Sequence, residues 1–240
     1  MRLILLLGVC FAISISEAAE VRVASAANFY PVLNKIVKKF EAETAHKVVI
    51  IRGSSGKLYA QIMNGAPYDV FLSADSERAD KLVENGNSYN GKTTVYANGL
   101  MALWLPEAKN TQQIKDQLLK GELRKIAIAN PKTAPYGKAA VETMKAMKIY
   151  SRLKHKLVFG ENISQTLQFV QAGAADIGFV ARSHVINDIY WKVDENLHGA
   201  IKQKMVLLKQ SKQIEAASEF MAYMQSPDIK KMINENGYKL

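Results

Sequence analysis

The stretch KVVIIRGSSGK, residues 47–57, holds the unit from which the rest of this chain is built. Its first part, Lys47–Ile51, is a β-branched run that is typical of a buried strand. The turn Gly53-Ser54-Ser55-Gly56 follows, and residues 55–64 then have the apolar spacing of an amphipathic helix. The sequence therefore predicts a strand, a tight turn and a helix, which together repeat in a parallel sheet covered by helices.

Three other turns of small and hydroxyl residues have the same setting, each after an apolar run and before an amphipathic helix. They are Ser25-Ala26-Ala27-Asn28, Thr133-Ala134-Pro135-Tyr136-Gly137 and Gly160-Glu161-Asn162-Ile163-Ser164. The first turn of a helix carries unpaired backbone N–H groups at the positive end of the helix dipole, so such a turn is suited to hold an anion. Two of the four turns lie in each half of the chain. This arrangement predicts two lobes that close on one small oxyanion.

Alternating strands and helices extend over the whole chain. We expect strands at residues 21–24, 47–51, 69–73, 100–105, 126–129, 157–159, 177–180 and 204–208. Helices are expected at 28–43, 55–64, 76–84, 111–120, 138–147, 164–172, 214–225 and 228–235, with short helical segments or turns at 151–153 and 183–188. This pattern predicts an α/β protein.

We expect the strands and helices to form two lobes, each a mixed, mostly parallel sheet flanked by helices. Residues 20–97 and 203–240 would make up the first lobe, and residues 98–202 the second. Because the chain has no Pro-rich linker, the lobes would be joined by hinge strands that cross near Ala97 and Lys202.

Residues 1–19 have the features of a secretory signal peptide. A basic residue precedes the apolar run 3–15, and small residues lead to a cleavage site after Ala18 or Ala19. An uncleaved membrane anchor is the alternative, but the apolar run is shorter than the about 20 residues of a spanning helix. The single cysteine, Cys10, lies inside this segment, so the exported chain would have no cysteine and would depend on its core for stability.

The formal net charge of +10 raises the question of a nucleic-acid or membrane partner. The lysines are spread along helix faces, however, and no dense basic block is interleaved with aromatic residues. We therefore expect a solvated basic surface and no nucleic-acid binding. A mild positive field would still help a dianion to arrive.

Several short motifs lie in a fixed order along the exported chain: residues 21–29, 53–58, 65–75, 128–131 leading to 136–137, 173–180 and 220–228. In order and spacing this set resembles the periplasmic molybdate-binding proteins of ABC importers. The resemblance implies a type II periplasmic binding protein, with no catalysis and no cofactor. It further implies that molybdate or tungstate is captured between the lobes and delivered to an ABC permease in the inner membrane. We expect a monomer.

The same resemblance assigns ligand contacts to each of the four turns. The residues implied, by backbone amides or side-chain donors, are Ala27, Asn28, Ser54, Ser55, Tyr136 and Ile163. For Asn28 and Tyr136 the side-chain donor is included beside the amide. A family tyrosine that donates its hydroxyl falls on Ala181 here, and the Tyr136 hydroxyl is the candidate replacement.

Molybdate, tungstate and sulfate are unprotonated dianions near neutral pH, so their site should present donors only. A phosphate site also needs an acceptor for the proton that phosphate carries. The only carboxylate in the four turns is Glu161, which we expect to face outward near a helix N-terminus. We expect Lys57, Lys138 and Arg182 to lie beside the site without touching the anion, because helix donors already stabilise it.

Two alternatives remain open. One is a carrier of sulfate or another oxyanion with the same fold. The other is a secreted hydrolase with Ser55 as nucleophile, although the Gly-x-Ser-x-Gly motif is missing and no histidine or carboxylate shares the turn. The histidines lack metal-binding spacing and are expected at the surface: His46, His155, His184 and His198.

Overall fold

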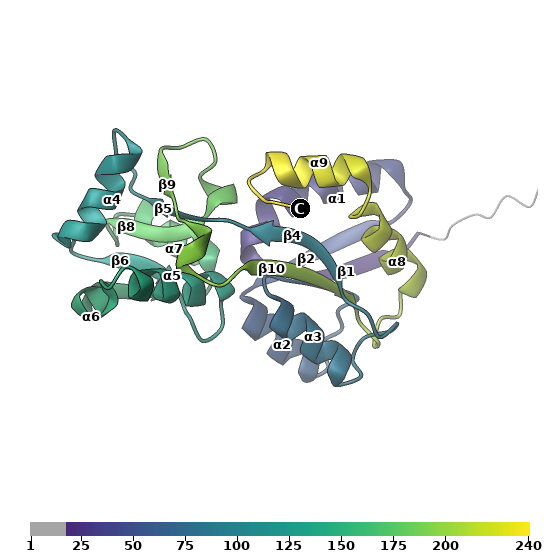
Figure 1. The fold of residues 1–240 in the computed structure, drawn as a ribbon. Helices are drawn as coiled ribbons and strands as arrows, with labels where there is room; N and C mark the ends of the chain where they lie inside the picture. The colour runs from purple at the N-terminus through teal and green to yellow at the C-terminus, as the bar shows by residue number, and fades with distance from the viewer. Residues whose placement is uncertain (1–17) are drawn as a thin grey trace, which may run out of the picture.

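The computed structural model describes residues 18–240, and Figure 1 shows that they form two α/β lobes side by side. The predicted signal peptide, with Cys10, lies almost wholly outside the described residues. Each lobe is built on a mixed five-stranded sheet, and the predicted fold class is confirmed. No helix among residues 18–240 is long and apolar enough to cross a membrane.

The first lobe contains the sheet β2-β1-β3-β10-β4. Its strands are β1 (Glu20–Ala26), β2 (Lys47–Gly53), β3 (Val70–Ser73), β4 (Thr94–Gly99) and β10 (Ile201–Leu207). Strand β1 is parallel to β2 and β3, whereas β10 is antiparallel to β3 and β4. The helical segments are η1 (Ala27–Phe29), α1 (Tyr30–Glu43), α2 (Ser55–Met63), α3 (Ser76–Glu84), α8 (Ile214–Tyr223) and α9 (Pro227–Glu235).

Strand β3 and residues 23–26 of β1, at the centre of the first sheet, are buried on both faces, which explains their nearly continuous runs of apolar and small residues. Val23 on β1 packs into the core formed with α1, α8 and α9, while its neighbour Ala24 packs with α2 and α3 on the other face. The C-terminal helices thus lie on the first sheet although they follow the second lobe in sequence (Figure 1).

The second lobe contains the sheet β7-β6-β8-β5-β9. Its strands are β5 (Met101–Trp104), β6 (Ile126–Ala129), β7 (Leu157–Gly160), β8 (Ile177–Ala181) and β9 (Tyr190–Lys192). Its helices are α4 (Thr111–Lys120), α5 (Pro135–Ala146), α6 (Tyr150–Leu153) and α7 (Ile163–Gln171), with 3-10 segments η2 (Lys154–Lys156), η3 (Arg182–His184) and η4 (Glu195–Leu197). Strand β6 is parallel to β7 and β8, while β5 is antiparallel to β8 and β9.

The chain passes between the two sheets twice. Leu100 alone separates β4 from β5, and the return path leads from the end of β9 to Ile201 at the start of β10. The expected lobe boundaries, at residues 97–98 and 202–203, fall inside β4 and β10, and they stay a prediction.

The expectation that the histidines lie at the surface is wrong for His46, which is 4% exposed. Its ring stacks on Phe40, its Nδ1 accepts the Ala19 N–H at 3.2 Å, and its Nε2 lies 3.2 Å from Glu219 Oε2. These polar partners allow a histidine to be buried at little cost. Of the others, His155 is exposed while two are half-buried: His184 and His198.

Candidate functional site

The four turns meet at one small cavity between the lobes, which we call the interlobe cavity. All six residues expected to contact the ligand line it, and the full lining is Ala26, Ala27, Asn28, Gly53, Ser54, Ser55, Ala74, Ala134, Pro135, Tyr136, Asn162 and Ile163. No lining residue is charged. The cavity therefore presents only neutral polar groups and apolar groups.

The starts of three helices point unpaired backbone N–H groups at this region. At α7, Asn162 Oδ1 accepts from Ser164 N and Gln165 N, which leaves the Ile163 amide without an acceptor in residues 18–240. At α5, Pro135 has no N–H, and the Gly137 and Lys138 amides both donate to the Ala134 carbonyl. The Tyr136 amide is therefore the one at this helix start that has no acceptor in the described chain. The local capping thus selects one amide per turn for a ligand.

The start of α2 also has one amide without an acceptor, although here a neighbouring amide bonds to the other lobe. The Gly56 N–H donates across the cleft to the Thr133 carbonyl at 2.9 Å. Leu58 N–H donates to Ser54 O at 3.0 Å, and the Ser55 amide has no acceptor in the described residues. Each of these helices therefore offers its positive end and a free amide to the cavity.

The two serines of the second turn add hydroxyl groups. Ser55 Oγ accepts the Ala74 N–H at 2.9 Å, so its own proton is left to donate elsewhere. Ser54 Oγ is buried and has no hydrogen-bond partner in residues 18–240. A buried hydroxyl without a partner is unfavourable, and an acceptor bound in the cavity would relieve that cost.

The Asn28 side chain does not point its donors at the cavity. Its Nδ2 donates to Gln203 Oε1 at 3.0 Å and to the Tyr238 hydroxyl at 3.3 Å. Tyr96 donates to the same Gln203 oxygen at 2.8 Å, and both Tyr238 and Ser183 bond to the Asn28 carbonyl, at 2.7 and 3.2 Å. Asn28 therefore belongs to a buried polar network at the hinge, and its backbone is the part that lines the cavity.

The Tyr136 hydroxyl also turns toward the hinge. A Cβ atom on Gly99 would press against this hydroxyl and would lie 2.6 Å from Gln203 Nε2, and Gly99 does not line the cavity. Burial raises the pKa of Tyr136 well above its usual value, so the hydroxyl stays protonated. The hydroxyl is thus poorly placed to replace the family tyrosine that the resemblance aligns with Ala181. Ala181 itself is fully buried at the end of β8.

The charged residues near the turns do not line the interlobe cavity. Lys57 Nζ lies 2.8 Å from Glu161 Oε1, and both side chains are exposed. Arg182 Nε donates to the Tyr190 hydroxyl at 2.8 Å. Lys138 lines a larger cleft beside the interlobe cavity. The described residues also contain no group of three or more metal-ligating side chains.

Sequence reasoning assigned no individual role to three residues that shape the site. Asn162 caps α7 and lines the cavity, and an asparagine just before a helix is the usual signal for this role. Gln203 is fully buried on β10, two residues from each of the buried residues Ile201 and Met205. Residues at this spacing lie on the same face of a strand, so the sequence pattern did place Gln203 on an inward face. Nothing in the local sequence indicated the role of Gly56, because the backbone that it contacts, at Thr133, belongs to the other lobe.

Two α/β lobes joined by two chain crossings, with a neutral cavity lined by helix starts between them, define a type II periplasmic binding protein. Residues 21–239 match the family described as bacterial extracellular solute-binding protein. The chain belongs to this family.

Named relatives give the family more detail. The molybdate-binding protein ModA of Azotobacter vinelandii is 38% identical over 245 residues, which cover 100% of this chain and 97% of that protein. ModA of Rhodobacter capsulatus is 40% identical over 93% of this chain and 89% of its own length. The solved structure of the A. vinelandii periplasmic molybdate-binding protein has a TM-score of 0.87 at 34% identity, covering 92% of this chain and 99% of that one. The resemblance read from the motifs is confirmed.

Proposed function

We propose that this protein captures molybdate or tungstate in the interlobe cavity and delivers it to an ABC permease in the inner membrane. Relatives that match nearly the whole chain are named for molybdate binding. The observation that carries the proposal is the cavity lining, in which helix starts and hydroxyl groups supply donors and no carboxylate supplies an acceptor. Such a site suits a fully deprotonated oxyanion.

In this proposal the anion contacts come from both lobes. Ser55 donates its hydroxyl and amide, Ser54 donates its otherwise unpartnered hydroxyl, and Tyr136 and Ile163 donate their amides. The backbone at Ala27 and Asn28 completes the shell. Glu161 is held outside by Lys57, so it does not repel the anion from within the cavity.

A sulfate carrier of the same fold is the second candidate, because sulfate presents the same acceptors on a smaller ion. Phosphate is disfavoured, because its remaining proton near neutral pH would find no carboxylate acceptor in the lining. The hydrolase alternative is excluded by the family, whose matched members are binding proteins. It also lacks support in the site, where neither a histidine nor a carboxylate lines the cavity beside Ser55.

The cellular setting completes the proposal. Membership of this family places the protein outside the cytoplasm, in the periplasm. We propose that residues 1–19 are a cleaved signal peptide, that the protein acts as a monomer without nucleic acid, and that residues 97–98 and 202–203 mark the lobe boundaries.

Calorimetric titration of the exported protein with molybdate, tungstate, sulfate and phosphate tests the function. We expect molybdate and tungstate to compete for one site, sulfate to bind more weakly, and phosphate to give no heat of binding near neutral pH. Tight phosphate binding, or two independent molybdate sites, would contradict the proposal.

A further inference from the structure

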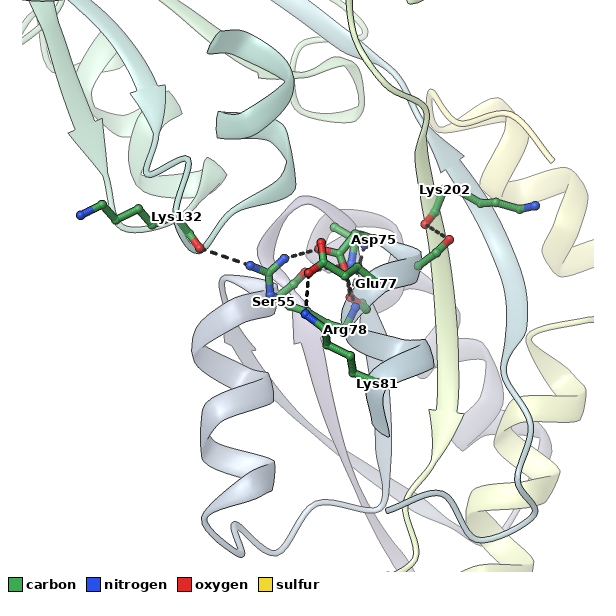
Figure 2. Close-up of polar contacts among 10 residues, drawn as sticks. Ser55, Asp75, Glu77, Arg78, Lys81, Lys132 and Lys202 are labelled. Atoms are coloured by element: carbon green, nitrogen blue, oxygen red, sulfur yellow. Dashed lines mark hydrogen bonds and ion pairs between the residues drawn. The ribbon is translucent and has the colours of Figure 1, made fainter. Parts of the chain in front are cut away.

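Two backbone carbonyls of the second lobe accept hydrogen bonds from the first lobe, immediately beside the interlobe cavity. The Gly56 N–H donates to Thr133 O at 2.9 Å, and Arg78 Nη2 donates to Lys132 O at 3.2 Å. Figure 2 shows the Arg78 guanidinium reaching from α3 to the loop that carries the Lys132 carbonyl. This loop leads directly into α5, whose first turn provides the Tyr136 amide.

Arg78 is oriented for this contact by its own lobe. Asp75 caps α3 by accepting the Arg78 backbone N–H at 3.0 Å, and its carboxylate also pairs with the Arg78 guanidinium. The Ser73 hydroxyl donates to the same carboxylate at 3.1 Å. Because Asp75 belongs to the same lobe and the same helix start as Arg78, this pair orients the guanidinium independently of the second lobe.

Gly56 allows the lobes to approach closely. A Cβ atom at this position would lie 2.9 Å from Thr133 O and 3.0 Å from Thr133 Cα, both backbone atoms of the other lobe. Gly56 lies within α2, where its own helix would accept an alanine. The Cβ atom would also lie 3.1 Å from Arg78 Nε in its own lobe, but that atom is at the far end of a flexible side chain. The Thr133 backbone can move away only if the lobes separate, so the closed arrangement is the main reason for glycine here.

The second loop of that lobe is also held, although more weakly. Lys57, next to Gly56, pairs with Glu161 at 2.8 Å, and each side chain is more than half exposed. Exposed ion pairs contribute little and are screened by salt. Beside this exposed ion pair, the hydrogen bonds to the Lys132 and Thr133 carbonyls link the two lobes directly on this side of the cavity.

We propose that Gly56 and Arg78, with the Lys132-Thr133 backbone, form a clasp that stabilises the closed form and so sets how slowly the anion leaves. Neither Gly56 nor Arg78 lines the interlobe cavity. The inference rests on the proposed function, because the anion is the ligand that the closed form retains. Apparent affinity scales with the population of the closed form, so loss of the clasp lowers affinity without removing any ligand contact.

The first test is Gly56→Ala, with molybdate as the probe. We expect the dissociation constant to rise about tenfold or more through faster release, because the added methyl group disfavours the closed form. Without anion, the melting temperature should stay the same or rise, because alanine is the better helix former. Affinity and stability should thus change in opposite senses, which general damage to the fold would not produce.

The second test is Arg78→Met, with Arg124→Met as its matched control. Arg124 also pairs with an aspartate, Asp176, at 2.8 Å, but that pair lies within the second lobe. We expect Arg78→Met to weaken molybdate binding about three- to tenfold. Arg124→Met should leave it unchanged, and Arg78→Lys should recover part of the loss.

Different results would contradict the proposed function and the clasp. A parent protein that binds none of molybdate, tungstate and sulfate would contradict the proposed function, and the clasp with it. A parent that binds molybdate, together with a Gly56→Ala variant of equal affinity and release rate, would contradict the clasp alone. Small-angle scattering at saturating molybdate should show a larger radius of gyration for Gly56→Ala than for the parent.

Discussion

At the scale of single residues, Ser55 has two roles that one substitution separates from each other. Its hydroxyl oxygen accepts the Ala74 N–H, and its proton is left for the anion. Ser55→Ala should therefore weaken molybdate binding by about ten- to a hundredfold, since a hydrogen bond to a charged group contributes about 1.5–3 kcal/mol. Titration calorimetry measures the loss.

The same substitution should also lower stability without ligand by about 1 kcal/mol, because the buried Ala74 N–H loses its acceptor. Ser54→Ala is the informative comparison, since its hydroxyl has no partner in residues 18–240. That variant should lose affinity while its stability stays the same. If neither serine variant binds molybdate less tightly, the hydroxyls do not contact the anion.

For the Tyr136 side chain, unlike the two serines, we expect that loss of the hydroxyl leaves molybdate binding nearly unchanged. Its hydroxyl lies against Gly99 at the hinge and has no hydrogen-bond partner by geometry in the described chain. Tyr136→Phe should therefore leave molybdate affinity within about twofold and leave stability equal or slightly higher. A tenfold loss in calorimetry would show that the hydroxyl, and not only the amide, serves the anion.

At the scale of elements, the sequence predicted most strands and helices because their apolar periods were clear. Helices α3 and α4 and strand β6 have the predicted bounds. Strand β9 was missed because it is a short, half-exposed edge strand whose two aromatics, Tyr190 and Trp191, carry no alternation. Strand β4 was expected only as a crossing, since its pairing with β10 depends on a segment about a hundred residues away.

The candidate site could be predicted to the level of turns but not of atoms. The six residues drawn from the family resemblance do line one cavity. The direction of the Asn28 amide depended on Gln203 and Tyr238, which come from the hinge strand and the C-terminus. Local sequence carries no information on such partners, so side-chain roles at the hinge needed the structure.

The contact between η3 and η1 predicts a pH effect. Burial lowers the pKa of His184 to about 4, while the backbone of Ala27 and Asn28 opposes this shift. An unfolded histidine has a pKa of about 6.5, so between about pH 6.5 and 4 the unfolded chain binds a proton that the folded chain does not. The free energy of unfolding should therefore fall as the pH is lowered through this window, and change little above it from this group.

Urea unfolding at saturating molybdate, at about pH 7.5 and 5.5, measures the effect. His184→Gln should lose less stability than the parent over this interval, because glutamine does not titrate. An equal loss in the two proteins would assign the pH dependence to other groups.

At the scale of the whole molecule, charge and site are separated. The chain carries a formal net charge of +10, yet no lining residue of the interlobe cavity is charged. Salt should therefore slow molybdate association, which depends on the long-range field, and should affect dissociation much less. Stopped-flow rates at low and physiological ionic strength measure both constants.

Lys57→Ala is the matching variant for this prediction. It should slow association modestly, and the difference from the parent should shrink as salt is added. A large rise in the dissociation rate instead would mean that the Lys57–Glu161 pair holds the lobes together more strongly than an exposed pair should.

The uncharged lining determines how many protons are exchanged on binding and how the net charge of the protein changes. Tyr136 is the one titratable side chain in the lining, and burial raises its pKa well above its usual value. A dianion should therefore enter at about pH 8 without release or uptake of a proton. The heat of binding should then be the same in buffers of different ionisation enthalpy. The loaded protein would carry the full negative charge of its cargo, so loaded and empty molecules should separate by electrophoretic mobility alone.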